Sequence, residues 1–214
     1  FRSLADLLRK CKPVNGHRPR SRVVVTADIW LGIAHELAED RSTLLGEWGD
    51  SLPVPSVHMA VMGEDTREIA VLTIECPGGS FPSVGAWHPP AIRPERAILS
   101  LFGIEPMDAP DMRPWLDLGF WDVQYPLGAR KPAPATRAPY AFLPVEGESL
   151  HQIPVGPVHA GIIEPGHFRF TAGGETVARL EQRLGYVHKG IESLMAGATI
   201  ERAAQLAART SGDS

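Results

Sequence analysis

The chain has 214 residues, of which 43% are hydrophobic and 21% are charged, and its formal net charge is -4. These values are typical of a globular protein with one sizeable domain or two small ones, and a negative charge without a dense Lys/Arg cluster argues against a nucleic-acid-binding protein. No apolar run approaches the roughly 18 residues of a membrane-spanning helix. Neither the start of the chain nor its two distant cysteines indicates a secreted or disulfide-bonded protein. We therefore expect a cytoplasmic protein that contacts a membrane only through partners.

The first half of the chain alternates between helical and strand-like patterns. Leucines at helical spacing, β-branched runs and the placement of Pro and Gly indicate the boundaries. They predict helices over Ser3–Lys10, from a cap at Asp28 onward and from Pro94 to Gly103, and strands over Val23–Thr26, Val57–Met62 and Ile69–Glu75. The polar segment 63–68 fits a hairpin connection between the last two strands. This mixture predicts an α+β fold class, with a small mixed sheet and flanking helices.

A proline-rich stretch follows, with seven prolines from Pro126 to Pro157. Proline favours extended backbone and lacks a hydrogen-bond donor, so the stretch cannot form the interior of a regular helix or sheet. We interpret it as a linker. The predicted organisation is an α+β domain over residues 1–128, a linker over 129–152 and a second domain over 153–214.

The second domain opens with strand-like alternation around residues 158–172, and Thr171–Glu175 fits a hairpin turn. The next segment, 175–185, is compatible with a helix or with a twisted strand, because its apolar residues fit helical spacing as well. Two helices are predicted after it, over His188–Met195 and Ala198–Arg209. The expected arrangement is a β-hairpin followed by helices.

Short motifs between residues 82 and 113 resemble the 30-kDa subunit in the peripheral arm of respiratory complex I (NADH-quinone oxidoreductase). The matching residues are Pro82-Ser83-Val84, Trp87, Glu95-Arg96, Leu101-Phe102-Gly103-Ile104 and Pro110-Asp111-Met112-Arg113. Asp108-Ala109 and Pro114 depart from the family's pattern. The resemblance implies that the first domain has the fold of the 30-kDa subunit.

The second domain resembles the start of the large subunits of energy-converting [NiFe] hydrogenases and of their counterpart in complex I. The matching motifs are Gly156–His159, Glu164–Arg169 and Gly185–Glu192. Fusion of a part like the 30-kDa subunit to a part like the large subunit is typical of those hydrogenases and of some forms of complex I. The resemblance implies a fused subunit that works with a quinone and with iron–sulfur clusters held by partner subunits.

The same resemblance implies three site residues. His159 and His167 match positions near a quinone headgroup pocket, where an imidazole can donate protons at neutral pH. Glu164 approximates the position of a proton-relay glutamate in [NiFe] hydrogenases. From the residues alone, structural histidines and a salt-bridged surface glutamate remain open alternatives.

The last residues of the sequence align with the motif that supplies metal ligands in [NiFe] hydrogenases. Hydrogenases of this type carry an Arg-x-Cys-Gly-x-Cys element whose cysteines bind nickel and iron, and here Ser211 and Ser214 occupy the two cysteine positions. A hydroxyl cannot replace a thiolate that bridges the two metals, so we expect no working [NiFe] site. The Arg-x-Asp-Tyr pattern of the quinone-reducing counterpart in complex I is also missing from this segment.

These observations predict a peripheral-arm subunit of an NADH-quinone oxidoreductase-like or energy-converting-hydrogenase-like electron-transfer complex. Such a subunit would bind no cofactor of its own, would not be catalytic alone, and would have an iron–sulfur subunit among its partners and no nucleic acid. It would be peripheral to the cytoplasmic membrane through the complex. The alternative is a structural or assembly protein of the same descent, without a redox role.

Overall fold

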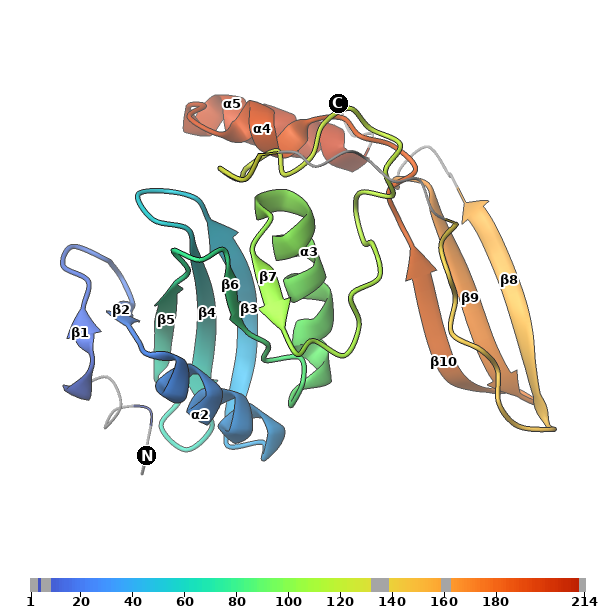
Figure 1. Cartoon of the computed structure of the whole chain (residues 1–214), viewed down its shortest axis with the longest axis horizontal. Coiled ribbons are helices and arrows are strands. Elements are labelled where there is room, and N and C mark those ends of the chain that lie inside the picture. Colours follow the sequence, from blue (N-terminus) through green and yellow to red (C-terminus); the bar gives the residue numbers. More distant parts are fainter. Residues whose placement is uncertain (1–3, 5–8, 132–138, 159–162, 212–214) are drawn as a thin grey trace. The chain divides into compact units, whose positions relative to one another are not determined.

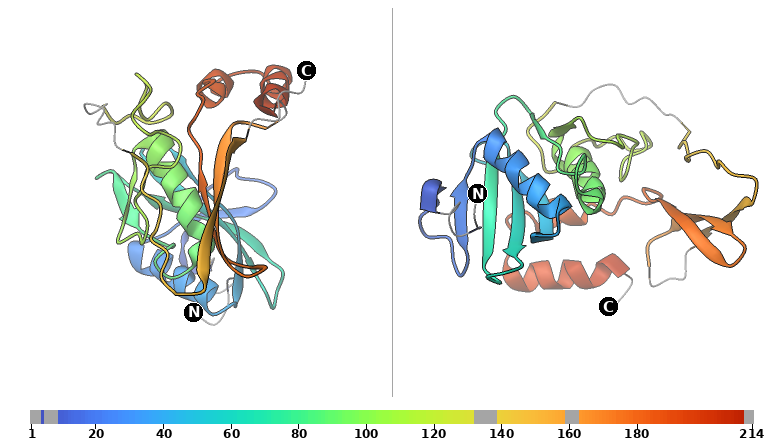
Figure 2. Two further views of the ribbon diagram at one scale, coloured as in Figure 1. Left: turned by 90° about the vertical axis from the view of Figure 1, so that its right-hand side faces the viewer. Right: turned by 90° about the horizontal axis from the view of Figure 1, so that it is seen from below.

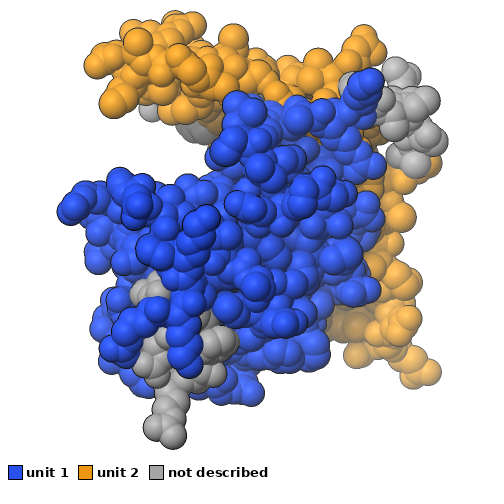
Figure 3. Space-filling model, turned by 60° about the vertical axis from the view of Figure 1, so that its left-hand side comes forward, with its two compact units in different colours: residues 1–112, 127–133 blue, residues 113–126, 134–214 orange. Residues whose placement is uncertain are grey.

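The computed structural model (Figure 1, with two further views in Figure 2) describes residues 4, 9–131, 139–158 and 163–211. The chain divides into two compact units, residues 1–112 with 127–133 and residues 113–126 with 134–214 (Figure 3). Each unit combines helices with a β-sheet, which confirms the predicted α+β class. In the described ranges, no helix is both long enough and apolar enough to cross a membrane.

A five-stranded sheet in the order β1-β2-β5-β4-β3 forms the centre of the first unit. Its strands are β1 (Lys12–Pro13), β2 (Ser21–Val24), β3 (Ser42–Asp50), β4 (Ser56–Gly63) and β5 (Ile69–Glu75). The predicted hairpin of β4 and β5 is confirmed, with Val57 opposite Ile74 and Val61 opposite Ala70. β2 pairs with β5 in parallel and the other neighbours are antiparallel, so the sheet is mixed as predicted.

Two helices, α2 (Ala27–Ala38) and α3 (Ile92–Phe102), pack on this sheet. Alternate side chains of the strands, such as Met59 and Leu72, join Trp30 of α2 and Ile98 of α3 in one continuous hydrophobic core. A strand places every second side chain on the same face, and this alternation supplies the apolar surface that both helices cover. The pair β6 (Ser80–Pro82) and β7 (Glu105–Met107) is parallel and adjoins α3.

Some predictions at the ends of these elements are confirmed and others are wrong. Gly103 ends α3 in the left-handed conformation, with φ 70°, as expected for a glycine at this position. Asp28 does not cap α2. The cap residue is Thr26, and Asp28 lies in the first turn, where its negative charge interacts favourably with the helix dipole. The predicted strand Val23–Thr26 is β2, which spans Ser21–Val24 and so begins and ends two residues earlier than predicted.

Strand β3 was not predicted at all. Its sequence contains Gly46, Glu47 and Gly49, and the register shifts between Leu44 and Gly46. Glycines and a buried glutamate weaken the apolar alternation that identifies strands, so only the pairing with β4 reveals this one. Of the predicted helix Ser3–Lys10, the described residues 4, 9 and 10 are helical.

The second unit contains a three-stranded antiparallel sheet in the order β10-β9-β8. Its strands are β8 (Leu150–Val158), β9 (Gly166–Gly173) and β10 (Thr176–Arg183), and the helices α4 (Ile191–Met195) and α5 (Ile200–Ala208) follow. The predicted hairpin turn is confirmed, because Gly173 pairs with Thr176. The ambiguous segment is therefore a strand. Thr199 caps α5 by accepting a hydrogen bond from the backbone N–H of Arg202 at 3.2 Å.

Candidate functional site

The motif residues of the first unit bind one another. The Glu95 carboxylate on α3 accepts hydrogen bonds from the Ser83 hydroxyl at 2.7 Å and from the backbone N–H groups of Val84 at 2.5 Å and Gly85 at 3.1 Å. Glu95 is only 1% exposed. Three donors on one buried carboxylate fix the Pro82–Gly85 turn against α3, because each of them would otherwise lose its contact with water without compensation.

The neighbouring motif residues form a second connection. The Arg96 guanidinium, 5% exposed, makes a 3.2 Å ion pair with Asp111 through Nη1 and Oδ2. This pair joins α3 to the Pro110–Arg113 motif. The motifs that are separated in sequence are therefore held together through two adjacent charged residues of α3, and their observed contacts maintain the fold of the first unit.

A second buried carboxyl group lies nearby, on β3. Glu47 is 8% exposed, and both of its carboxylate oxygens are buried without a hydrogen-bond partner among the described residues. Burial, and secondarily the charge of Glu95, raises the pKa of Glu47 well above its usual range. Burial also raises the pKa of Glu95, against the lowering effect of its three hydrogen bonds. Burial without a partner disfavours the charged form of this carboxyl group.

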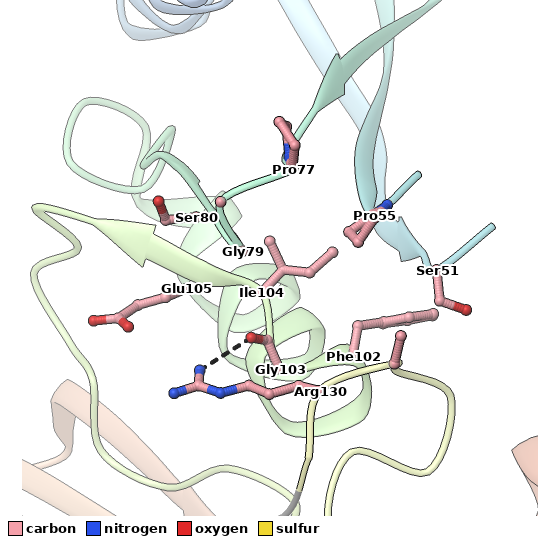
Figure 4. Close-up of a pocket in the computed structure, with 12 residues that line it drawn as sticks. Ser51, Pro55, Pro77, Gly79, Ser80, Phe102, Gly103, Ile104, Glu105 and Arg130 are labelled. Atoms are coloured by element: carbon pink, nitrogen blue, oxygen red, sulfur yellow. Dashed lines mark hydrogen bonds between the residues drawn. The ribbon is translucent and has the colours of Figure 1, made fainter. Parts of the chain in front are cut away.

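A pocket of about 510 Å³ opens in the first unit (Figure 4). Phe102, Gly103 and Ile104 line one side of it and the Pro77–Ser80 turn lines another. The Arg130 guanidinium at its edge donates a 3.2 Å hydrogen bond to the carbonyl of Gly103 (Figure 4). This bond satisfies a carbonyl at the end of α3 and connects Arg130 to the helix.

Lys189 contacts two other segments of the second unit. Its ammonium nitrogen lies 3.7 Å from Glu164 Oε1 and donates a 3.0 Å hydrogen bond to the carbonyl of Thr210. Thus one side chain of the Gly185–Glu192 motif connects the Glu164–Arg169 motif with the turn at Arg209–Ser211. Glu164 is 43% exposed and Lys189 is 41% exposed, so solvent weakens the attraction between them.

His167 lies at the start of β9. Its Nδ1 is 3.3 Å from the carbonyl oxygen of Gly156, and its ring packs against Phe142 with 5.2 Å between the centroids. The other ring nitrogen, Nε2, is buried without a hydrogen-bond partner in the described ranges. The His167 side chain is therefore connected to the first residue of the Gly156–His159 motif, through the Gly156 carbonyl.

The remaining predicted site residues are described only in part. His159 and Ser214 lie outside the described residues, and Ser211 is described in its backbone alone, within the short 3-10 helix Arg209–Ser211. Among the side chains that are described, no three His, Cys, Asp or Glu residues come together in a group that could hold a metal ion.

Sequence reasoning missed a row of charged and polar side chains on β9 and β10. His167, Arg169 and Thr171 on β9 lie opposite Arg183, Glu181 and Arg179 on β10, respectively. The alternation of Arg179, Glu181 and Arg183 was the available signal, because a two-residue period places all three on one face of a strand. It was hidden by the helical spacing of the apolar residues in the same segment.

The chain is similar to subunits of hydrogenase complexes. No family model matches it. Formate hydrogenlyase subunit 5 of Escherichia coli (strain K12) is 37% identical over 123 residues, which are 53% of this chain and 22% of that protein. Hydrogenase-4 component G of the same organism is 30% identical over 178 residues, 78% of this chain and 30% of that protein. The chain thus spans less than a third of the length of these curated relatives.

Among solved structures, the trypsin-resistant fragment of Nqo5 aligns with a TM-score of 0.43 and 20% sequence identity, over 50% of this chain and 96% of that one.

Proposed function

Since this chain is related to subunits of hydrogenase-type complexes, we propose that it is a peripheral-arm subunit of an electron-transfer complex of the hydrogenase or complex I kind. The supporting observation is the similarity to hydrogenase-4 component G, whose 178 aligned residues are more than either compact unit contains. The aligned region therefore includes residues of both units. In this proposal the chain binds no redox cofactor of its own and meets the membrane only through partners.

The proposed partner is an iron–sulfur subunit, and the proposed substrate of the complex is a quinone. His159 and His167 would line the quinone pocket. The His167 ring contacts Phe142 and the Gly156 carbonyl, and these two contacts fix the orientation of the ring. An oriented imidazole is suited to proton donation to a quinone oxygen.

Glu164 would relay protons in the same proposal. Its ion pair with Lys189 keeps the carboxylate close to the Arg209–Ser211 turn, because Lys189 also binds the Thr210 carbonyl there. In a working hydrogenase this turn would lead into the metal ligands. The serines at positions 211 and 214 favour a chain without a working [NiFe] site.

The second candidate function is that of a structural or assembly protein without a redox role. The serine pair and the mutual hydrogen bonds of the first-unit motif residues favour it, since both are compatible with a scaffold. This candidate predicts normal assembly of the complex and no dependence of its turnover on His159, Glu164 or His167.

Co-expression of the full chain with an iron–sulfur subunit from the same genome tests the proposal. We expect co-purification of the two proteins with the iron–sulfur cluster in the partner, and no nickel in metal analysis. If the chain purifies alone under every co-expression condition, the proposal loses its basis.

Quinone reduction by the assembled complex then separates the two candidates. His159→Ala and His167→Ala should each lower the turnover rate by about a hundredfold if these imidazoles donate protons, whereas His151→Ala, at an exposed position on β8, should leave it unchanged. Unchanged rates in all three variants would identify the chain as a structural protein.

A further inference from the structure

One face of the β9–β10 hairpin carries more cationic groups than its single carboxylate can pair. Glu181, 6% exposed, accepts a 2.7 Å hydrogen bond from Arg113 Nη1 and a 3.1 Å bond from the backbone N–H of Leu143, both at Oε1. Its other oxygen, Oε2, lies 3.6 Å from Arg179 Nε. Two arginines therefore share this carboxylate.

Arg169 and Arg183 have no such partner. They flank Glu181 on the same face, Arg169 directly opposite it and Arg183 two residues further along β10. In the described part of the chain, neither guanidinium forms an ion pair with a carboxylate, and the Nε atom of each is buried without a hydrogen-bond partner. Partly buried positive charge without a counter-ion is unfavourable, because water screens it less than on an open surface.

Aromatic rings hold both guanidinium groups in position. The Arg169 guanidinium carbon lies 3.8 Å from the centroid of the Phe142 ring, and that of Arg183 lies 4.7 Å from the Tyr186 centroid. A guanidinium stacked on a ring keeps the N–H groups at its edge available for an acceptor. The rings thus orient the donors without consuming them.

Two further polar atoms lie in the same row without a partner. The Thr171 hydroxyl, in a side chain that is 3% exposed, and His167 Nε2 are both buried and unpaired among the described residues. Thr171 precedes Gly173 on the face that carries Arg169, and His167 lies opposite Arg183. Four unpaired polar groups on adjacent positions of one face point to a common missing partner.

We propose that this face binds an oxyanion, the phosphate or carboxylate of a small-molecule ligand, between Arg169 and Arg183 with His167 at its edge. Guanidinium groups match the geometry of both oxyanions, because two parallel N–H groups can donate to two oxygens at once. The ligand would supply the negative charge that Glu181 cannot provide to these two arginines. The site requires only the second unit, and it shares His167 with the proposed quinone pocket, whereas Arg169 and Arg183 have no role in that proposal.

Titration of the full chain with inorganic phosphate, and separately with succinate, at constant ionic strength tests the site. NMR of the arginine Nε–H groups is the direct readout. We expect saturable shifts of the Arg169 and Arg183 signals with at least one of the two anions. Arg169→Gln and Arg183→Gln should each weaken binding about tenfold or more, and Arg183→Lys, which keeps the charge, should weaken it less.

Arg202→Gln is the matched control. Arg202 lies on α5 and its guanidinium makes a hydrogen bond to Gln205, so its loss should leave the binding unchanged. Non-saturating shifts with both anions, or equal losses in Arg183→Gln and Arg202→Gln, would overturn the proposal. The proposal would also be wrong if the chain bound neither phosphate nor succinate but bound an acidic segment of a partner subunit at this face. If Arg169→Gln does not fold by circular dichroism, the Arg183 variants and the wild-type shifts still decide the outcome.

Discussion

Glu95 shows how a single side chain can hold a motif together. Its carboxylate receives three hydrogen bonds from Ser83, Val84 and Gly85, and the adjacent Arg96 reaches Asp111. A buried acceptor with several donors is costly to remove, because every donor then lacks a partner. The Glu-Arg pair of the motif is thus explained by contacts inside the first unit.

Glu95→Ala should therefore lower the free energy of unfolding by about 3 kcal/mol or more. Urea unfolding followed by tryptophan fluorescence measures this change. The control is Glu105→Ala, at an exposed position on β7, which should alter the free energy by no more than about 0.5 kcal/mol. Equal stability of the two variants would contradict the role assigned to Glu95.

Glu47 should make the stability of the chain depend on pH above the ordinary pKa of a glutamate side chain. Its pKa is raised in the folded state by burial and by Glu95, so its contribution is complete below the pKa of the unfolded chain. That contribution is lost as pH rises through the folded-state value, at about 1.4 kcal/mol per pH unit. Glu47→Gln should remove this slope and be more stable than the wild type at pH 8.

Denaturant titrations at pH 5 and pH 8 measure the effect of Glu47. Glu75→Gln, at the exposed end of β5, is the control and should keep the wild-type slope. A wild-type slope in Glu47→Gln would show that Glu47 is not the group responsible.

His58 should make the chain less stable as pH falls, which is the opposite of the effect of Glu47. Its Nδ1 lies 2.9 Å from the Thr73 hydroxyl, which also accepts a 2.9 Å hydrogen bond from Arg22 Nε. Burial, followed by the charge of Arg22, lowers the pKa of His58 to about 4. The stability from neutral His58 is present above the unfolded pKa near 6.5 and is lost as pH falls toward the folded value.

Between pH 6.5 and pH 5 this loss should amount to about 2 kcal/mol in the wild type. His58→Gln should show a smaller decrease in denaturant titrations over the same range, and His151→Gln, at an exposed position, should behave like the wild type. The same decrease in all three proteins would assign the acid sensitivity to other groups.

At the scale of elements, β3 and α3 approach each other at a glycine. A Cβ atom on Gly49 would lie 2.6 Å from a ring carbon of Phe102, so the close packing of strand and helix requires glycine there. Gly46 lies on the same strand and has open space at its Cβ position. The two glycines thus differ in packing although they share one element.

Gly49→Ala should destabilise the first unit by about 1–3 kcal/mol, because the ring or the helix must move to accommodate the methyl group. Gly46→Ala is the matched control and should change the stability by less than about 1 kcal/mol. Thermal unfolding of both variants by circular dichroism measures the difference. Similar melting temperatures would contradict the close contact.

Strand β10 shows a conflict between two sequence patterns. Its apolar residues fit a helix and its charged residues Arg179, Glu181 and Arg183 fit a strand. Pairing with β9 decides in favour of the strand, and the charged face then becomes the proposed oxyanion site. Hydrogen bonds to a partner strand are long-range contacts, which local periodicity does not contain.

At the scale of the whole molecule, the two units differ in how much apolar surface they bury. The continuous core of β2–β5, α2 and α3 lies in the first unit. In the second unit, β8 has exposed side chains from His151 to Pro157 and only intermediate burial at its two ends. Regions with few buried contacts open at low free-energy cost.

Hydrogen–deuterium exchange followed by mass spectrometry should therefore show slow exchange in β4 and β5 and much faster exchange in β8. The two central strands of the first sheet provide an internal reference in the same sample. Equal protection of β5 and β8 would show that the second unit is as stable as the first.

The sequence by itself determined the α+β class, the β4–β5 hairpin, the stop of α3 at Gly103 and the resemblance to hydrogenase and complex I subunits. Each of these rests on residues that are close together in the chain. The tertiary structure alone decided that 42–50 and 176–183 are strands, that Glu95 binds the Ser83 turn, and that Arg169 and Arg183 lack a carboxylate partner among the described residues. These features depend on pairing and burial between distant segments, whose free energy no local pattern records.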